Sequence, residues 1–232
     1  MGYGAKPCAD ERPTERALGR PPKQPDQRGR ILEAAARAIA TDGYEQCSLA
    51  RVARELGLTR PALYHYFPTK QRIFAEIAMS TARGMTAHVH AAVDDTLSTA
   101  GQLRALMIAY AEYLETHYWM VSAALTGARC SERLERGDRE AFETLRRACM
   151  APFEQTLRHG MAKGELRSRD VDDTLRFIFQ LLDVTRWFRP DGTKRAADFA
   201  RDACALLLDG LRSDTAKTLL NDDATYHERD QR

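Results

Sequence analysis

The sequence predicts an all-α fold of about nine helices, with a small N-terminal three-helix bundle followed by a larger helical domain. Apolar residues recur at the three- and four-residue spacing of amphipathic helices from residue 27 almost to residue 214. No run of alternating β-branched residues, which would indicate a strand, interrupts this pattern. The length of 232 residues is enough for a small domain joined to a larger one.

The predicted domains follow from changes in composition along the chain. Residues 1–26 hold five prolines, charges of both signs and few apolar side chains, so we expect a disordered tail. We expect residues 27–78 to form the three-helix bundle, residues 79–214 the larger helical domain and residues 215–232 a C-terminal tail. No apolar run reaches the roughly 18 residues that span a bilayer, and the N-terminus lacks an apolar signal-peptide core. These features predict a cytoplasmic protein that does not associate with membranes.

Composition and motifs argue against an enzyme, a metal centre or a cofactor site. The five cysteines are scattered, odd in number and never spaced C-x-x-C, which is typical of reduced thiols. His88 and His90 are two residues apart, so on a helix they point away from each other and cannot share a metal. The sequence contains no H-E-x-x-H, G-x-S-x-G, G-x-G-x-x-G or Walker motif.

The segment SLARVARELGLTRPALYHYFPTK, residues 48–70, predicts two short helices joined by a tight turn. Ser48 is expected to cap the first helix and Gly57 to end it. Thr59 is expected to cap the second, whose first turn tolerates Pro61 because amides there have no intrahelical partner. Two short helices with a glycine between them are typical of a helix-turn-helix.

A helical wheel sorts the rings of the second helix. At about 100° per residue, Leu63 and Phe67 fall together and point into the bundle. His65 points the opposite way, and Tyr64 and Tyr66 lie on the two shoulders. Three side chains with polar tips therefore line an outward face, although such residues also occur as the amphipathic shoulders of a compact bundle.

The surroundings of this face favour a nucleic acid as partner. Ser48 and Thr59 stand at helix N-termini, where free amides bind phosphates. Lys70 begins the next helix, where a cation opposes the helix dipole unless an anion lies nearby. Arg60 is placed to reach a guanine edge, and the small Ala62 lets the helix approach a surface closely.

Residues 28–77, including VARELGLTRPALYHYF, resemble the N-terminal domain of the TetR family of bacterial transcriptional regulators. The resemblance implies that the second and third helices form a helix-turn-helix and that the third enters the major groove of double-stranded DNA. It implies phosphate contacts from Ser48, Tyr66 and Lys70. It implies contacts with base edges from Thr59, Arg60, Pro61, Ala62 and Tyr64. The wheel alone adds His65 to this predicted DNA-binding set.

The same resemblance implies a C-terminal domain that binds a small-molecule effector and dimerises. Rings and arginines of the later helices are the candidates for an effector site, although packed core is the default for rings at helical spacing. The candidate ligand-binding residues are Tyr110, Tyr113, His117, Trp119, Phe142, Arg176, Phe177 and Trp187. The last two long helices, residues 170–188 and 194–212, are amphipathic and predict a homodimer interface.

A second resemblance concerns HGMAKGELRSRDVDDTLRFIFQLLDVTRWFRPDG, residues 159–192. It is similar to the C-terminal region of a TetR subgroup that controls lipid and steroid breakdown and senses acyl-CoA thioesters. Arg176, Arg186 and Arg189 would then serve the phosphates of the ligand, although exposed ion pairs are the commoner fate of such arginines.

Together these features predict a ligand-responsive, DNA-binding transcriptional regulator. We expect a repressor that a small apolar effector, with an acyl-CoA thioester as one candidate, releases from a palindromic operator. The sequence leaves activation open as the alternative sign of regulation. It also leaves open a helical small-molecule-binding or scaffold protein that kept the fold and lost DNA binding.

Overall fold

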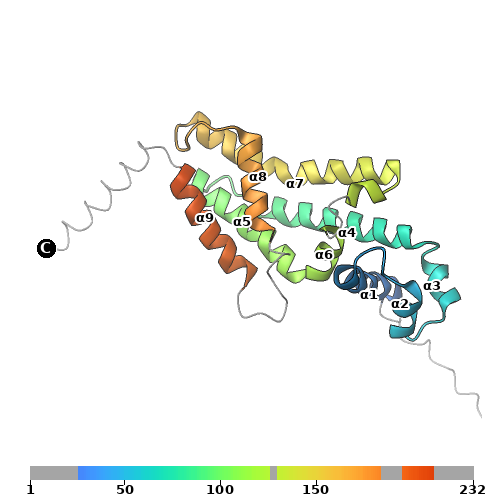
Figure 1. The fold of residues 1–232 in the computed structure, drawn as a ribbon. Coiled ribbons are helices and arrows are strands. Elements are labelled where there is room, and N and C mark those ends of the chain that lie inside the picture. The colour runs from blue at the N-terminus through green and yellow to red at the C-terminus, as the bar shows by residue number, and fades with distance from the viewer. Residues whose placement is uncertain (1–25, 126–129, 184–194, 212–232) are drawn as a thin grey trace, which may run out of the picture.

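The computed structural model describes residues 26–125, 130–183 and 195–211 of the chain. Its elements are α1 (Gln27–Asp42), α2 (Leu49–Glu55), α3 (Arg60–Tyr66), α4 (Lys70–Ala91), α5 (Thr99–Thr116), α6 (Tyr118–Leu125), the 3₁₀ helix η1 (Cys130–Arg133), α7 (Arg136–Ala162), α8 (Val171–Leu182) and α9 (Ala196–Leu211). The predicted all-α fold is confirmed for the described ranges, which hold nine α-helices (Figure 1). The predicted tails lie outside the described residues, apart from Asp26, which precedes α1.

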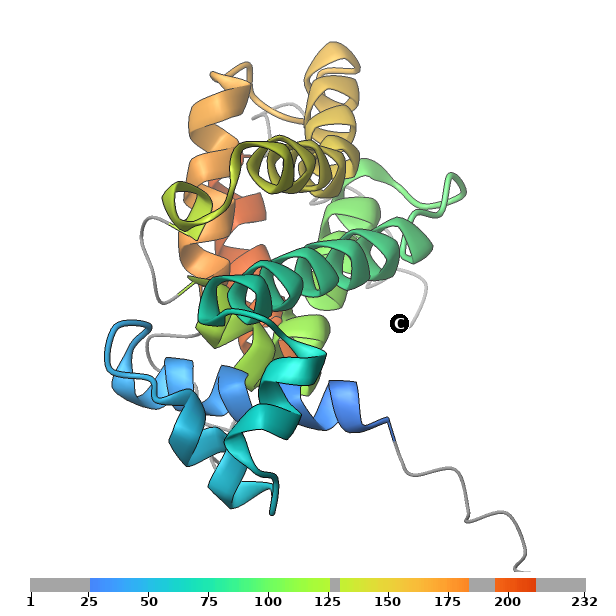
Figure 2. The same cartoon turned by 90° about the vertical axis from the view of Figure 1, so that its right-hand side faces the viewer.

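The helices build an elongated molecule with two ends. α1, α2 and α3 lie at one end, and α8 and α9 lie toward the other (Figures 1 and 2). α4 connects them, packing against α1 near its start and against α7 over much of its length. Among the described helices, none combines the length and apolarity needed to cross a bilayer.

Two clusters of buried apolar side chains hold the helices together. The bundle core, which includes Phe67 and Phe74, fills the space between α1, α2, α3 and the start of α4. The second core, which includes Leu106 and Phe153, joins the later half of α4 to α5, α7, α8 and α9. α4 belongs to both cores, and it therefore runs unbroken through the predicted domain boundary at residue 78.

The bundle core is completed by residues from the later part of the chain. Ala123 of α6 and Leu134, which follows η1, are 0% and 2% exposed and belong to the bundle core. Trp119 and Met120 of α6 also pack against it. A unit of about 50 residues buries little apolar surface by itself, so these contacts add to its stability.

Two helix boundaries determine how the later helices pack. α4 and α5 are separated by residues 92–98, and the Ser98 hydroxyl caps α5 by accepting the Gly101 amide at 3.2 Å. The long ring-rich segment that follows divides at His117 into α5 and α6. This division lets α5 pack against α9 while α6 packs against α1.

Two glycines of α7 provide a matched test of the packing. An added Cβ at Gly160 would lie 2.4 Å from Thr99 Cγ2 and 2.8 Å from Leu166 Cδ1, whereas one at Gly137 would meet nothing within 4 Å. We expect Gly160→Ala to lower the free energy of unfolding by about 1 kcal/mol or more, because overpacking outweighs the gain in helix propensity. Gly137→Ala should raise it by about 0.5 kcal/mol. Urea denaturation followed by circular dichroism measures both, and equal effects at the two sites would contradict the close packing at Gly160.

Candidate DNA-binding and effector sites

The turn between α2 and α3 is closed by a pair of backbone hydrogen bonds. The Gly57 amide donates to the Arg54 carbonyl at 3.1 Å, and the Leu58 amide donates to the Ala53 carbonyl at 2.8 Å. This pattern is a Schellman motif, and it places Gly57 at φ +67°, a conformation that costs glycine little. The sequence therefore fixes the angle at which α3 leaves α2.

The two predicted caps behave differently. Thr59 caps α3 as expected, since its hydroxyl accepts the Ala62 amide at 3.3 Å. Ser48 occupies the N-cap position of α2, but its side chain is exposed and makes no capping hydrogen bond. The Ser48 hydroxyl and the first amides of α2 are thus placed to meet a phosphate.

The rings of α3 are sorted as the wheel predicts. Leu63 and Phe67 are fully buried, and His65 is exposed. Tyr64 and Tyr66 are half-buried on the shoulders and pack partly on the bundle core. The outward side of α3 therefore presents polar side-chain groups whose rings pack on the bundle core, as expected for a helix that enters a DNA groove.

The other predicted DNA-binding residues lie around this outward side. Thr59, Arg60 and Pro61 are exposed at the start of α3, and Ala62 is half-buried beside them. The Arg60 guanidinium carbon lies 5.5 Å from the centre of the Tyr64 ring, so the two side chains lie together. α3 itself lies at the end of the molecule away from α8 and α9 (Figure 1).

Lys70 is held by a cluster that we name the Tyr44 clasp, made of Tyr44, Glu45, Lys70 and Arg133. The Lys70 Nζ donates to the Glu45 carbonyl at 3.0 Å and lies 4.6 Å from the centre of the Tyr44 ring. Arg133, which ends η1, also lies 4.6 Å from the Tyr44 ring and forms an ion pair with the Glu45 carboxylate. The clasp therefore joins the start of α4 to the segment that follows α6.

Further contacts extend this connection along the start of α4. The Gln71 Nε2 donates to the Arg133 carbonyl at 3.1 Å, and Arg72 lies 3.3 Å from the Asp138 carboxylate of α7. Sequence reasoning missed Arg133 and Asp138, because they lie more than 60 residues from their partners and stand in no local pattern.

Arg28, a basic residue near the start of α1, is engaged in contacts within the bundle. Its guanidinium pairs with both carboxylate oxygens of Glu76, donates to the Tyr66 carbonyl at 3.1 Å and lies 4.3 Å from the Phe67 ring centre. The hydrogen bond with Glu76 raises the pKa of Arg28 above its ordinary value. Arg28 thus ties the end of α3 to α1 and α4.

An apolar cavity of about 360 Å³ lies between α4, α5, α6, α7 and α8. Three predicted ligand-binding residues, Tyr110, Phe142 and Arg176, line it. The remaining lining residues are Thr81, Ala82, Met85, Leu114, Val121, Ala124, Leu125, Leu145, Arg146, Cys149, Met150, Phe179, Gln180 and Asp183. Burial raises the pKa of Cys149 to about 11, so its thiol is neutral and adds to the apolar wall.

The other predicted ligand-binding residues are placed elsewhere. Tyr113 faces Gly84 of α4 and stacks on His117, which follows it by one helical turn, with ring centres 4.1 Å apart. Trp119 turns toward α1, with the Arg37 guanidinium 5.8 Å from its ring, and Phe177 is 67% exposed. Trp187, like Arg186 and Arg189, lies outside the described residues.

A basic pocket adjoins the apolar cavity. It measures about 640 Å³, and it shares Arg146, Met150 and Arg176 with the cavity. Arg147 adds a third guanidinium, while Glu154 and Asp172 contribute carboxylates. Three guanidinium groups and two carboxylates therefore line the pocket beside the apolar cavity.

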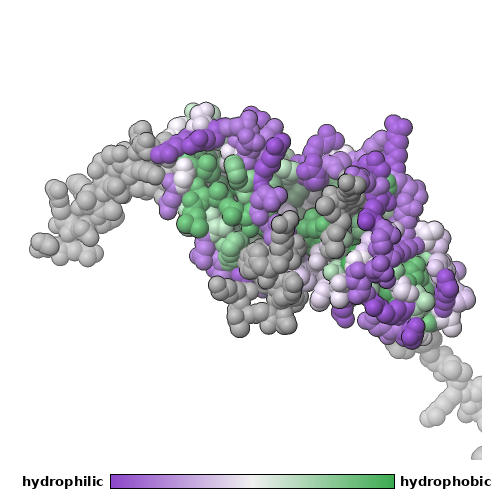
Figure 3. All heavy atoms as spheres, in the orientation of Figure 1, coloured by the Kyte–Doolittle hydropathy of each residue, from purple (hydrophilic) through white to green (hydrophobic). Residues whose placement is uncertain are grey.

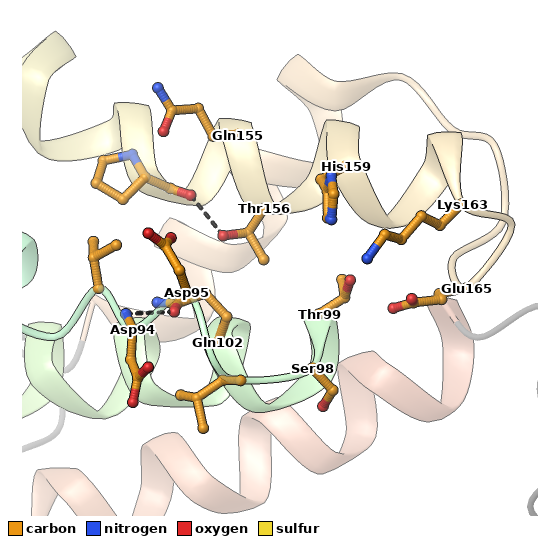
Figure 4. Close-up of a pocket in the computed structure, with 13 residues that line it drawn as sticks. Asp94, Asp95, Ser98, Thr99, Gln102, Gln155, Thr156, His159, Lys163 and Glu165 are labelled. Carbon is orange, nitrogen blue, oxygen red and sulfur yellow. Dashed lines mark hydrogen bonds between the residues drawn. The ribbon is translucent and has the colours of Figure 1, made fainter.

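A third pocket, of about 350 Å³, is polar and lies between the α4–α5 connection and the end of α7 (Figure 4). Asp95 enters it from the connection, while His159 and Lys163 enter it from α7 and its C-cap. Asp94 and Asp95 lie in the connection, where two hydrogen bonds from Thr96 lower the pKa of Asp94. None of the residues lining this pocket belongs to the bundle core, so it lacks the connection to α3 that the apolar cavity has.

The turn between α2 and α3 and the outward face of α3 define a helix-turn-helix of the DNA-binding kind, followed by a helical domain that contains an apolar cavity. Residues 31–77 match the family model described as bacterial regulatory proteins, tetR family. Residues 96–211, half of the chain, match a tetracyclin repressor-like C-terminal domain. The chain belongs to the TetR family, and its fold and the resemblance of residues 28–77 are both confirmed.

Known relatives and solved structures agree with this assignment. The transcriptional repressor KstR2 of Mycobacterium tuberculosis is 28% identical over 188 residues, which cover 80% of this chain and 92% of KstR2. The crystal structure of the TetR family regulator PfmR from Thermus thermophilus superposes with a TM-score of 0.71 and 34% identity, covering 79% of this chain and all of PfmR. The structure of AibR in complex with isovaleryl coenzyme A and operator DNA shares the fold, with a TM-score of 0.67, 23% identity and coverage of 79% and 98%.

The helical wheel predicts that His65 contacts DNA, whereas the family resemblance does not imply this contact. We expect Tyr64→Ala to weaken binding to the DNA that flanks the gene by about tenfold or more, since a base contact is worth roughly 1–3 kcal/mol. His65→Ala should weaken it by a smaller factor, roughly threefold, through loss of a backbone or groove contact. Fluorescence anisotropy at fixed salt measures both, with His159→Ala as a control for loss of an exposed histidine. Unchanged affinity in His65→Ala would restrict the contact set to the residues implied by the resemblance.

Proposed function

We propose that this protein is a repressor whose homodimer binds a palindromic operator and leaves it when an amphipathic anion enters the apolar cavity. The observation that carries the proposal is that the cavity and the reading helix α3 are joined through α4, α6 and the bundle core. Acting on bacterial DNA would place the protein in the cytoplasm. Its relatives named KstR2 are transcriptional repressors, which argues for regulation rather than catalysis.

The coupling runs through residues that belong to both sites. Phe142 lines the cavity and also packs against the bundle core. α6 supplies Val121 and Ala124 to the cavity and buries Ala123, which lies between them in the same helix, in the bundle core. A ligand that displaces α6 or Phe142 therefore changes the position of α3 relative to the rest of the molecule. If the ligand binds the displaced arrangement more tightly than the original one, it increases the population of the displaced arrangement.

The chemistry of the cavity favours an effector with an apolar body and an anionic head. The cavity suits an acyl or alicyclic group, and the adjoining guanidinium groups suit phosphates or a carboxylate. The side chains of Arg146 and Arg176 now form exposed ion pairs with Glu143 and Asp173, at 2.8 and 3.5 Å. Such pairs contribute little, so a phosphate can replace them. Acyl-CoA thioesters combine these features, and AibR has been solved with isovaleryl coenzyme A.

The proposed dimer uses α8 and α9. Phe177, Leu181 and Leu206 are large apolar residues on these helices, and Leu206 is 76% exposed. Figure 3 shows an apolar area over α9 at the end away from α3. Pairing these helices across a two-fold axis would bury the exposed apolar side chains and present two copies of α3 to two half-sites.

Operator release tests the effector class. Acyl-CoA thioesters should release labelled operator from the protein, whereas coenzyme A alone should do so poorly because it lacks the apolar group. Arg146→Ala and Arg176→Ala should each raise the half-maximal acyl-CoA concentration by about tenfold, since each removes a charge-assisted hydrogen bond. Arg136→Ala, which removes an exposed arginine of α7 that pairs with Glu140 outside both pockets, is the matched control.

The outcomes of that titration separate the alternatives. If neither arginine substitution changes the acyl-CoA concentration needed to release the operator, the proposed binding site for the anionic group of the effector would be wrong. Failure to bind the flanking DNA at low salt would favour a helical binding protein that has lost DNA binding.

Charge introduced on α8 and α9 tests the dimer. We expect Phe177→Glu and Leu206→Glu to shift the protein toward the monomer in analytical ultracentrifugation and to weaken operator binding, because a buried unpaired carboxylate destabilises an interface. Leu97→Glu, at a comparably apolar exposed position in the α4–α5 connection, should leave the dimer intact. A dimer that survives Leu206→Glu at micromolar concentration would argue against this interface.

A further inference from the structure

Thr81 is a polar residue in the wall of the otherwise largely apolar cavity, and its hydroxyl has no hydrogen-bond partner among the described residues. The residue is 7% exposed. It lies on α4, one residue before Ala82 and four before Met85, which also line the cavity.

Most threonines in the described helices bond their hydroxyls within their own helix, whereas Thr81 and Thr99, the first residue of α5, have buried hydroxyls without a partner among the described residues. The hydroxyls of Thr41, Thr86, Thr144, Thr156 and Thr174 each donate to the carbonyl four residues earlier, at 2.7–2.9 Å. The corresponding carbonyl for Thr81 is that of Ile77, which accepts from the Ser80 hydroxyl at 3.1 Å instead. Within the described part of the chain, the Thr81 hydroxyl thus makes neither the helix contact that its counterparts make nor any other.

A buried hydroxyl without a partner destabilises a protein, and valine would fill the same space without that cost. Tyr110, on α5, adds a second hydroxyl to the same cavity. Burial raises the pKa of that phenol, so it remains a neutral group that can donate a hydrogen bond. The Thr81 hydroxyl can be satisfied by a ligand that brings oxygen into the cavity, and the Tyr110 hydroxyl lies in the wall of the same cavity.

We infer that the effector carries a hydroxyl or carbonyl oxygen on its apolar part and that this oxygen hydrogen-bonds the Thr81 hydroxyl. The inference rests on the proposed function, because it takes the apolar cavity as the effector site. A change of the Thr81 χ1 angle from one staggered rotamer to another turns its hydroxyl toward the ligand, since threonine populates two such rotamers in helices. Thr81 thereby selects oxygenated acyl groups over hydrocarbon chains of equal length.

Matched thioesters test the inference. Saturated acyl-CoA thioesters are compared with hydroxyacyl- and oxoacyl-CoA thioesters of equal length, substituted at successive carbons, in release of labelled operator. We expect one position of substitution to lower the half-maximal concentration by about tenfold for the unaltered protein, as one added hydrogen bond would. Thr81→Val should abolish this preference, and Thr81→Ser should retain it.

Thr144→Val is the control, because it removes a threonine hydroxyl of α7 that is exposed and bonded within its own helix. Thermal unfolding without ligand checks that each variant folds. Equal potency of saturated and oxygenated thioesters, or a preference that survives Thr81→Val, would overturn the inference and leave the proposed function standing. No release by any thioester would overturn both the proposed effector class and the inference.

Discussion

The constraint on which the structure depends is the shared bundle core. Ala123 and Leu134 belong to the larger C-terminal part of the chain, yet they are buried among the side chains of α1, α3 and α4. Small bundles have little apolar surface to bury. Side chains from another domain that complete this core therefore both stabilise α3 and fix its position. The DNA-binding helices consequently cannot move independently of α6.

The same constraint supports the proposal that the apolar cavity controls the distant DNA-binding surface. Close-packed interiors do not deform smoothly, and a side chain such as Phe142 that is packed on two sides transmits displacement from one to the other. α4 offers a second path, since its middle lines the cavity and its first residue, Lys70, lies at the proposed phosphate-contacting face. The polar pocket of Figure 4 has no such connection and is not needed for the coupling.

The helix-turn-helix could be predicted in detail because its signals are local. Gly57 demands a left-handed turn, Thr59 is an effective cap, and the wheel places Phe67 inside and His65 outside. The DNA contacts themselves remain predictions, since burial and geometry show which side chains face outward and not what they touch.

The apolar cavity, the proposed effector site, could be predicted only in part, because its geometry depends on how distant helices pack. Tyr110 and Tyr113 are one turn apart and equally apolar, but only Tyr110 lines the cavity, since α4 approaches α5 at Gly84 on the side of Tyr113. Phe177 and Phe179 point to different sides of α8, and only Phe179 lines the cavity. The division between α5 and α6 at His117 turns Trp119 away from the cavity and toward α1. No proline or glycine at this position indicates the division in the sequence.

The Tyr44 clasp also bears on how long the protein stays on DNA. An exposed lysine ordinarily loses rotamer freedom when it docks on a phosphate, but the Lys70 ammonium is already ordered over Tyr44 and against the Glu45 carbonyl. Much of that ordering is completed when the protein folds. Because Arg133 supports the same ring and the same glutamate from the larger C-terminal part of the chain, loosening η1 would return mobility to Lys70. Effector action would then appear mainly as a shorter residence time on the operator rather than as slower association.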